Sequence, residues 1–84
     1  MFEARIHITL KKSVLDPQGD TVRSALASLG FQGVADCRVG KFMIVRLNEQ
    51  SLAKAEAEVD EMCRKLLANP VIEDYVFQIT EVAT

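Results

Sequence analysis

Two short proline-containing segments set where the helices of this chain begin and end. In the first, Asp16 precedes Pro17, an arrangement typical of a helix N-cap followed by the first helical residue. In the second, Pro70 follows Asn69, and a proline both stops a helix and excludes helical geometry from the residue before it. The chain should therefore enter a helix near residue 16 and leave another before residue 70.

The hydrophobic pattern predicts three strand regions around these junctions. Residues 2–11 alternate apolar and polar side chains, as expected of a strand with one buried face. Residues 34–47 form the second region, in which residues 42–45 (FMIV) are apolar on both faces, so both faces should be covered. Gly40 interrupts this region as a bulge, a bend or a hairpin turn. The region could therefore be one long strand or two short strands. The last strand is predicted at residues 72–82.

Two helices are predicted between these strands. The first spans residues 17–29, and Gly30 is placed to end it in a left-handed conformation. The second spans residues 49–68, with Asn48 or Ser51 as its N-cap. The apolar face of the first helix carries Val22, Ala25, Leu26 and Leu29. The order of the predicted elements is strand, helix, one or two strands, helix and strand. It predicts an α+β, ferredoxin-like two-layer sandwich, β-α-β(β)-α-β, with two helices on one face of an antiparallel sheet.

Size and composition narrow the classes of function. The 84 residues amount to one domain, residues 1–84, whose core alone rarely supplies more than about 3–5 kcal/mol. Because 49% of the residues are apolar, we expect part of that surface to be buried against a second subunit. A net charge of −2 argues against a nucleic-acid partner, and the apolar runs are too short to cross a membrane. The two cysteines are typical of reduced, cytoplasmic thiols.

No catalytic group occurs in a setting that suggests chemistry. His7 is the only histidine and lies on the polar face of the first strand, so it is interpreted as a surface or interface residue. Asp16 is explained as a helix cap, and a serine should replace it with little loss. Glu73 and Asp74 point to opposite faces of a strand and form no dyad. We therefore predict no catalytic residue, no metal site and no cofactor on this chain.

Residues 38–41 (RVGK) form the one basic cluster outside a helix. In a regular strand Arg38 and Lys41 would face opposite ways, whereas a bulge at Gly40 would bring them to the same side. Such a pair could hold an anion or contact an acidic partner, and the alternative is a solvated turn. The segment lacks the glycine-rich pattern of a phosphate-binding loop.

Taken in chain order, several segments resemble the PurS family, the small subunit of phosphoribosylformylglycinamidine (FGAM) synthase. They are residues 10–11, 14–19, 22, 25–26, 29–30, 38–41 and 63–75. DPQG at residues 16–19 and LLANPVIE at residues 66–73 are specific in combination, and the resemblance covers nearly the whole chain. Residues 12–13 (KS) depart from the family, which often has proline or glycine there, and this affects one turn.

The resemblance implies a non-catalytic subunit of a complex that makes FGAM from formylglycinamide ribonucleotide, glutamine and ATP in de novo purine synthesis. A PurL-type synthetase subunit carries out the ATP chemistry, and a PurQ-type glutaminase subunit releases ammonia. A PurS homodimer or tetramer would bridge them in the cytoplasm and support ammonia transfer. The candidates for contact with these partners are Arg38, Gly40, Lys41, Gln18 and Asn69. Asp16, Pro17, Gly30 and Pro70 are interpreted as structural junctions.

Two other functions remain open from the sequence. An ACT-like regulatory module has a similar layout and binds amino acids, often at a glycine-containing turn after the first strand. Here the turn at residues 12–17 has no glycine, and Gly19 already lies inside the helix. A small ferredoxin-like enzyme would have only His7 to support it.

Overall fold

The computed structural model describes residues 1–83 and confirms the α+β class and the order β-α-β-α-β. A five-residue π-helical turn, η1 (Cys63–Leu67), directly continues helix α2 (Leu52–Met62). The elements are β1 (Phe2–Leu10), α1 (Pro17–Ser28), β2 (Gly40–Leu47), α2 (Leu52–Met62), η1 (Cys63–Leu67) and β3 (Glu73–Glu81).

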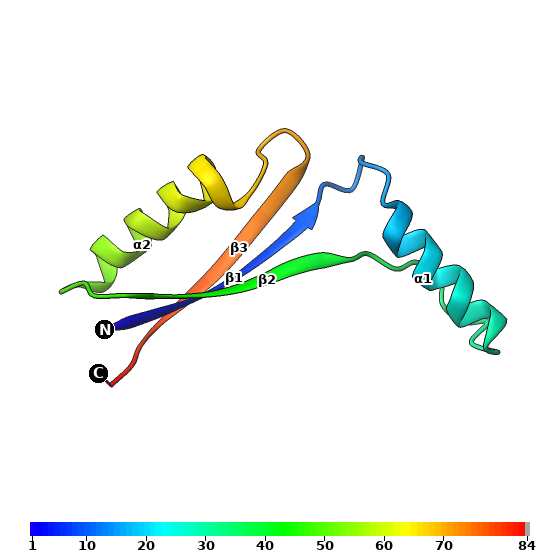
Figure 1. Ribbon diagram of the computed structural model, residues 1–84, viewed down its shortest axis with the longest axis horizontal. Helices are drawn as coiled ribbons and strands as arrows, with labels where there is room; N and C mark the ends of the chain where they lie inside the picture. Colours follow the sequence, from blue (N-terminus) through cyan, green and yellow to red (C-terminus); the bar gives the residue numbers. More distant parts are fainter. Residues whose placement is uncertain (84) are drawn as a thin grey trace.

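The three strands form one antiparallel sheet with β1 in the centre, in the order β2-β1-β3 (Figure 1). The predicted alternation of β1 is confirmed, because Phe2, Ala4, Ile6 and Ile8 are buried while Arg5, His7 and Thr9 are exposed. The same period holds in β3, where Tyr75, Phe77 and Ile79 pack against the core and Val76 is exposed. A central strand with one apolar face therefore organises the core.

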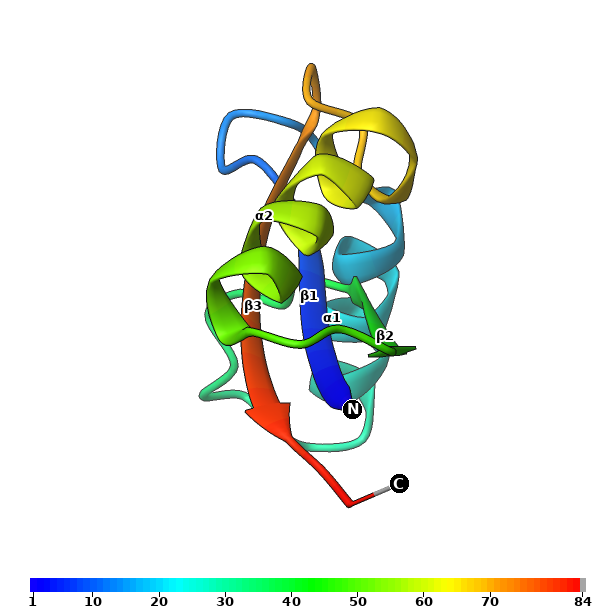
Figure 2. The same cartoon turned by 90° about the vertical axis from the view of Figure 1, so that its left-hand side faces the viewer.

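Helix α2 covers one face of this sheet and supplies the other half of the core (Figure 2). Ala55, Val59 and Cys63 are completely buried, so Cys63 serves as a small core residue. Ser51 caps the helix, because its hydroxyl accepts a hydrogen bond from Lys54 N at 3.2 Å. The predicted helix at residues 49–68 thus begins three residues later, and its last turn is π-helical.

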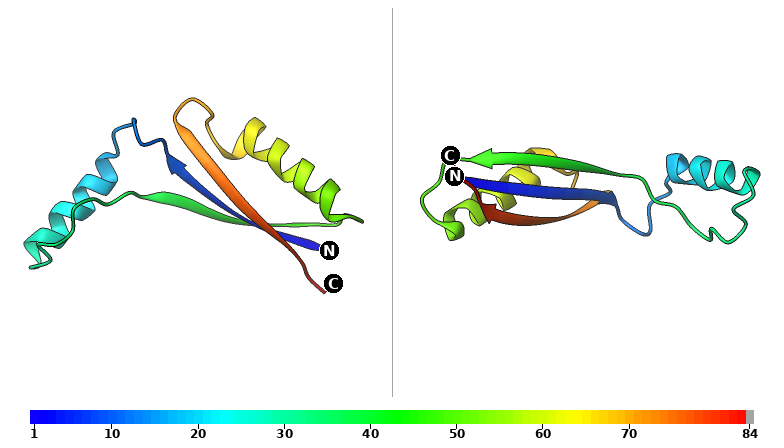
Figure 3. Two further views of the ribbon diagram at one scale, coloured as in Figure 1. Left: turned by 180° about the vertical axis from the view of Figure 1, so that it is seen from behind. Right: turned by 90° about the horizontal axis from the view of Figure 1, so that it is seen from below.

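Helix α1 does not lie over the sheet, which corrects the expected placement of two helices on one face. It projects beyond the end of the sheet, and the two linkers that carry it run side by side (Figures 1 and 3). The radius of gyration is 16.4 Å and the molecule measures 50 × 29 × 14 Å, whereas a compact chain of this length has a radius near 12 Å. The loops on both sides of α1 are hydrogen-bonded to each other where they leave the sheet.

Both ends of α1 follow the sequence prediction. Asp16 is the N-cap and Pro17 the first helical residue. At the other end Gly30 has φ +103°, the amide of Gly30 donates to Ala27 O at 3.1 Å, and the amide of Phe31 donates to Leu26 O at 3.0 Å. These two bonds make a Schellman cap, which needs a residue with positive φ at this position.

The second strand is shorter than predicted. Residues 34–39 are not in a strand, and β2 begins at Gly40, which pairs with Thr9 without a bulge, a bend or a hairpin turn. Gly40 is required for another reason: a Cβ there would lie 2.6 Å from Ile8 O on the neighbouring strand. In the single chain the second face of β2 is open, since Phe42 and Ile44 are 53% and 54% exposed.

Candidate functional site

Most of the predicted site residues meet at the junction between α1 and the sheet. We call residues 11–19 and 37–41 the neck, and residues 20–36, which it carries, the arm. A cavity of about 190 Å³ lies at the neck, with Asp16, Gln18, Gly40, Lys41 and Glu73 among its lining residues. Three of the five contact candidates, Gln18, Gly40 and Lys41, therefore line one cavity, and Arg38 lies on the same linker as Gly40 and Lys41.

Asp16 joins the two linkers of the neck. Its carboxylate is buried, with Oδ1 accepting from Gly19 N at 2.9 Å and Oδ2 accepting from Val39 N at 2.9 Å. The amides of Gly19 and Val39, together with the nearby charge of Arg38, hold the pKa of Asp16 below its usual value. The cap is confirmed, but a serine hydroxyl would have to serve two amides on different linkers, so Asp16→Ser is no longer expected to be harmless.

Arg38 reaches across the neck in the opposite direction. Its guanidinium donates from Nη2 to Lys11 O at 2.7 Å and from Nη1 to Val14 O at 3.2 Å, while its side chain remains largely exposed. Lys41 does not join Arg38 in a common cation pair, because its Nζ lies 3.4 Å from a carboxylate oxygen of Glu73. The basic cluster is thus divided between two internal tasks, and its contact with a partner subunit remains a prediction.

Asn69 and Pro70 form the turn that leads into β3, close to the neck. The amide of Asn69 donates to Glu73 Oε1 at 2.7 Å, and Asn69 Oδ1 accepts from Val71 N at 3.0 Å. The Asn69 amide and the Lys41 ammonium hold the pKa of Glu73 below its usual value. Lys11 N also donates to Ile72 O at 2.9 Å, so the turn and the neck are hydrogen-bonded to each other.

Gly19 is a neck residue whose role sequence reasoning missed. It is buried, and a Cβ at this position would overlap the carbonyl oxygen of Cys37 on the returning linker. The signal was a glycine in the first turn of a helix, where it costs helix stability and is not needed for capping. Such a glycine indicates close approach of another backbone segment, and here that segment is the second linker.

A second feature is an apolar groove of about 550 Å³ beside α2, on the side of the sheet that α1 leaves uncovered. We call it the α2 groove. It is lined by Val45, Met62, Leu66 and Leu67, with Glu58, Glu61 and Lys65 around them. Leu66 lies in the π-helical turn and is 82% exposed. The groove is therefore largely a product of that turn.

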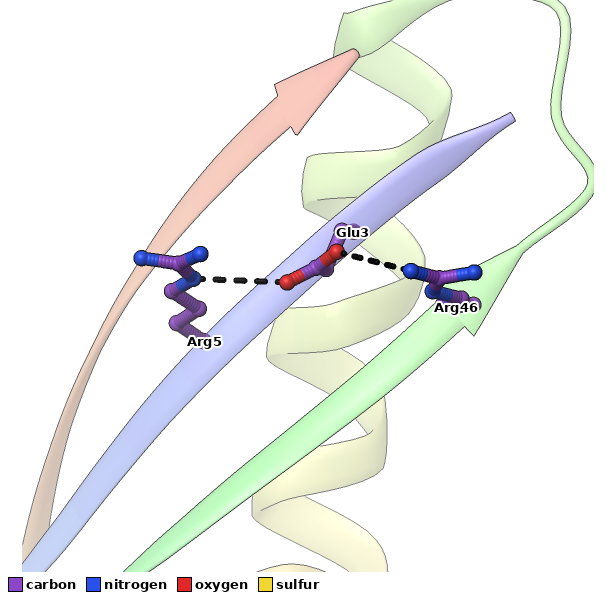
Figure 4. A network of polar contacts seen from close by, with 3 residues as sticks. All are labelled: Glu3, Arg5 and Arg46. Carbon is purple, nitrogen blue, oxygen red and sulfur yellow. Dashed lines mark hydrogen bonds and ion pairs between the residues drawn. The ribbon is translucent and has the colours of Figure 1, made fainter. Parts of the chain in front are cut away.

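The open face of the sheet, opposite α2, carries a small charged network. Glu3 is 8% exposed and lies between Arg5 and Arg46, with ion-pair distances of 3.3 and 3.5 Å (Figure 4). His7 lies on the same face, where its ring is 4.7 Å from that of Phe42. These contacts agree with the interpretation of His7 as a surface or interface residue.

The part of the chain that the structure describes suggests neither a metal centre nor a membrane-spanning helix. Among residues 1–83, no three His, Cys, Asp or Glu side chains are placed to hold a metal ion together. The helices within the same residues all lack the length and hydrophobicity needed to cross a membrane. Glu73 and Asp74 differ in exposure, as expected for neighbours on opposite faces of β3. The geometry at the neck thus holds backbone segments together and assembles no acid–base pair.

Comparison with known protein families identifies the family of this chain. Residues 3–81 match the family described as PurS, phosphoribosylformylglycinamidine (FGAM) synthase. The chain belongs to the PurS family. Relatives named as FGAM synthase subunit PurS include that of Bacillus subtilis, 46% identical over 98% of this chain and 96% of the relative. The PurS subunit of Synechocystis is 47% identical over 94% of this chain and 79% of the relative.

Solved structures of PurS proteins share the fold. The Bacillus subtilis PurS structure has a TM-score of 0.86 with 46% identity, covering 96% of this chain and all of that one. PurS of Methanocaldococcus jannaschii has a TM-score of 0.87 with 42% identity, covering 99% of this chain and all of that one. A chain in the structure of PurLQS from Thermotoga maritima has a TM-score of 0.87 with 29% identity, covering 94% and 96%. None of these comparisons supports an ACT-like regulatory module.

Proposed function

We propose that this chain is the non-catalytic small subunit of an FGAM synthase complex in de novo purine biosynthesis, where it bridges the synthetase and glutaminase subunits and supports ammonia transfer. The observation that carries the proposal is the match to the PurS family over residues 3–81. The likeness to a chain of the PurLQS structure from Thermotoga maritima supports a role within a complex of that kind. The expected partners are a PurL-type synthetase and a PurQ-type glutaminase, in the cytoplasm.

The geometry of the titratable groups supports a role without catalysis. Asp16 is occupied by two backbone amides, and Glu73 by an amide and the Lys41 ammonium. The ring of His7 packs in a tilted arrangement against that of Phe42. Asp16, Glu73 and His7 thus each have a structural partner within the chain. ATP, glutamine and their chemistry would then belong to the larger subunits, and this chain would carry no cofactor.

We propose that the chain forms a homo-oligomer, because its shape leaves two apolar surfaces exposed. The arm presents an apolar surface to solvent, with Leu29 74% and Phe31 58% exposed. A helix of 12 residues is marginal in water without packing, so this surface needs a partner. The α2 groove lies where the ferredoxin-like layout would place a second helix, and its lining is apolar. We propose that the arm of one copy packs in the α2 groove of another, at least as a dimer.

Reconstitution tests the function. The purified chain is mixed with PurL-type and PurQ-type subunits from the same organism, and FGAM formation is measured with glutamine and, separately, with ammonium salts. Glutamine-dependent synthesis should require this chain, whereas ammonia-dependent synthesis by the synthetase should depend on it less. Full glutamine-dependent activity without the chain would reject the proposal. Calorimetric titration with free amino acids should give no heat, and saturable heat would favour an ACT-like module.

Sedimentation tests the homo-oligomer. An interface of ordinary size buries about 1,200–2,000 Å² in total, so the chain should sediment as a dimer or larger at tens of micromolar. A monomer under those conditions would reject the assembly proposal while leaving the subunit function to be decided by reconstitution.

A further inference from the structure

The direction in which the arm projects is not fixed by packing against the sheet. Two linkers carry the arm past the end of the sheet, and α1 makes no extensive contact with any strand (Figures 1 and 3). A helix held only by two flexible linkers would swing freely and would meet a second copy in many orientations. The direction of the arm must therefore come from contacts within the neck.

Two side chains cross the neck in opposite directions. Asp16, on the outgoing linker, accepts the amide of Val39 on the returning linker at 2.9 Å while it caps α1 through Gly19 N. Arg38, on the returning linker, donates to Lys11 O at 2.7 Å and to Val14 O at 3.2 Å on the outgoing linker. Both contacts involve a charged group and backbone partners, which are stronger than neutral hydrogen bonds.

The two linkers also touch through their backbones. Gly19 is so close to Cys37 O that even a methyl group would not fit between them. At the base of the neck, Gly40 approaches Ile8 O closely enough to exclude a Cβ, and Lys11 N donates to Ile72 O at 2.9 Å. The neck is thus closed between the linkers and attached to the sheet and to the turn before β3.

We propose that Asp16 and Arg38 are positioning residues that fix the direction of the arm relative to the sheet. The proposal rests on the proposed homo-oligomer, because a fixed arm meets the α2 groove of a second copy in a single orientation. Arg38 acts here through backbone carbonyls of its own chain, which differs from the contact with a larger subunit expected from the sequence. Loss of either side chain releases the arm while leaving the core formed by the sheet and α2 in place.

The test uses the variants Arg38→Ala and Asp16→Ala, with Lys12→Ala as the matched control. Lys12 lies in the same loop and is exposed, so its replacement removes a nearby charge without removing either bridge. Hydrogen exchange at the amides of Gly19 and Val39 reports on the closed neck, and small-angle X-ray scattering reports on the shape of the particle. Sedimentation gives the dissociation constant for self-association.

In Arg38→Ala and Asp16→Ala, we expect exchange at these two amides to accelerate about tenfold or more, with wild-type exchange in the core of β1. The self-association constant should weaken about tenfold or more, because a charged hydrogen bond contributes enough free energy for that factor. Lys12→Ala should match the wild type in both. Arg38→Lys should rescue only in part, since an ammonium lacks the fork that reaches two carbonyls.

The outcomes separate the two proposals. A monomeric wild type rejects the homo-oligomer, and the neck is then decided by exchange and by the scattering curve of the monomer. Wild-type exchange and scattering in both alanine variants would overturn the positioning role, whatever the oligomer. Accelerated exchange with unchanged self-association would also overturn it, because the direction of the arm would then not matter for assembly.

Discussion

The two helices of this chain are stabilised in different ways. Helix α2 buries Ala55 and Val59 against the sheet, so its stability comes from packing. Helix α1 has better caps at both ends, yet only Gly19 is buried along its length. Caps contribute about 1 kcal/mol each, which decides where a helix starts and stops but seldom holds a short helix by itself. The comparison shows that a helix can have well-marked ends in the sequence and still bury almost none of its surface within its own chain.

The largest effect that separates the two regions should come from the core. Ile6 is completely buried in β1, so Ile6→Ala should lower the free energy of unfolding by about 2–5 kcal/mol and leave much of the protein unfolded. Leu29→Ala, on the exposed face of the arm, should leave the unfolding of the isolated chain nearly unchanged. Urea titration at low micromolar concentration measures both. Equal losses in the two variants would show that the arm belongs to the core.

For self-association, in contrast to unfolding, a substitution on the arm should have a large effect. Leu29→Asp and Leu66→Asp place a carboxylate on the two surfaces proposed to meet, and each should weaken self-association about tenfold or more, since a buried charge needs a partner. Ser24→Asp, on the opposite face of α1, is the control and should assemble as the wild type does. Sedimentation equilibrium provides the measurement. Unaltered assembly of both leucine variants would exclude the proposed arm–groove contact.

Acid should act on the neck before it acts on the core. Because the pKa of Asp16 is lowered in the folded chain, its stabilising contribution is complete above the unfolded value of 3.8 and is lost as pH falls below it. Hydrogen exchange near Gly19 and Val39 should therefore accelerate as pH is lowered toward 3, beyond the intrinsic change seen in unfolded peptides. In Asp16→Asn this additional pH dependence should be absent, and its persistence would assign the titration to another group.

The smallest expected effect is at the cap of α2. Ser51→Ala removes the hydrogen bond to Lys54 N and should cost about 1 kcal/mol of unfolding free energy without weakening self-association. Ser24→Ala, an exposed serine in the middle of α1, should change neither quantity. Thermal unfolding followed by circular dichroism is sufficient. A loss of assembly in Ser51→Ala would mean that the start of α2 contributes to the interface.

Local chemistry explains what the sequence could predict. Asp16-Pro17, Gly30 and the alternation of β1 each depend on neighbours in the chain, and the structure confirms all three. The placement of α1 could not be predicted this way. The apolar face of a helix does not indicate whether it packs against its own sheet or against another chain. The two bonds from Arg38 were equally inaccessible, since they span 24 and 27 residues of sequence.

The sequence singles out several residues of the neck but not the contacts that they make. Residues 38–41 were recognised as unusual from their charge, and the cavity at the neck includes Gly40 and Lys41. Their partners, the carbonyls of Lys11 and Val14 and the carboxylate of Glu73, lie on other elements and have no distinctive pattern. Only Gly19 offered a readable signal that was missed, because a glycine early in a helix indicates a close backbone neighbour.

The central position of β1 has a consequence for how this protein is made. Strand β1 pairs along its length with β3, which lies far from it in the sequence, in a register that places Phe2 opposite Glu81 and Ala4 opposite Ile79. Such pairing spans nearly the whole sequence, and long-range pairing of this kind slows folding. The sheet therefore closes only once β3 has been synthesised, and until then one edge of β1 lacks its partner strand.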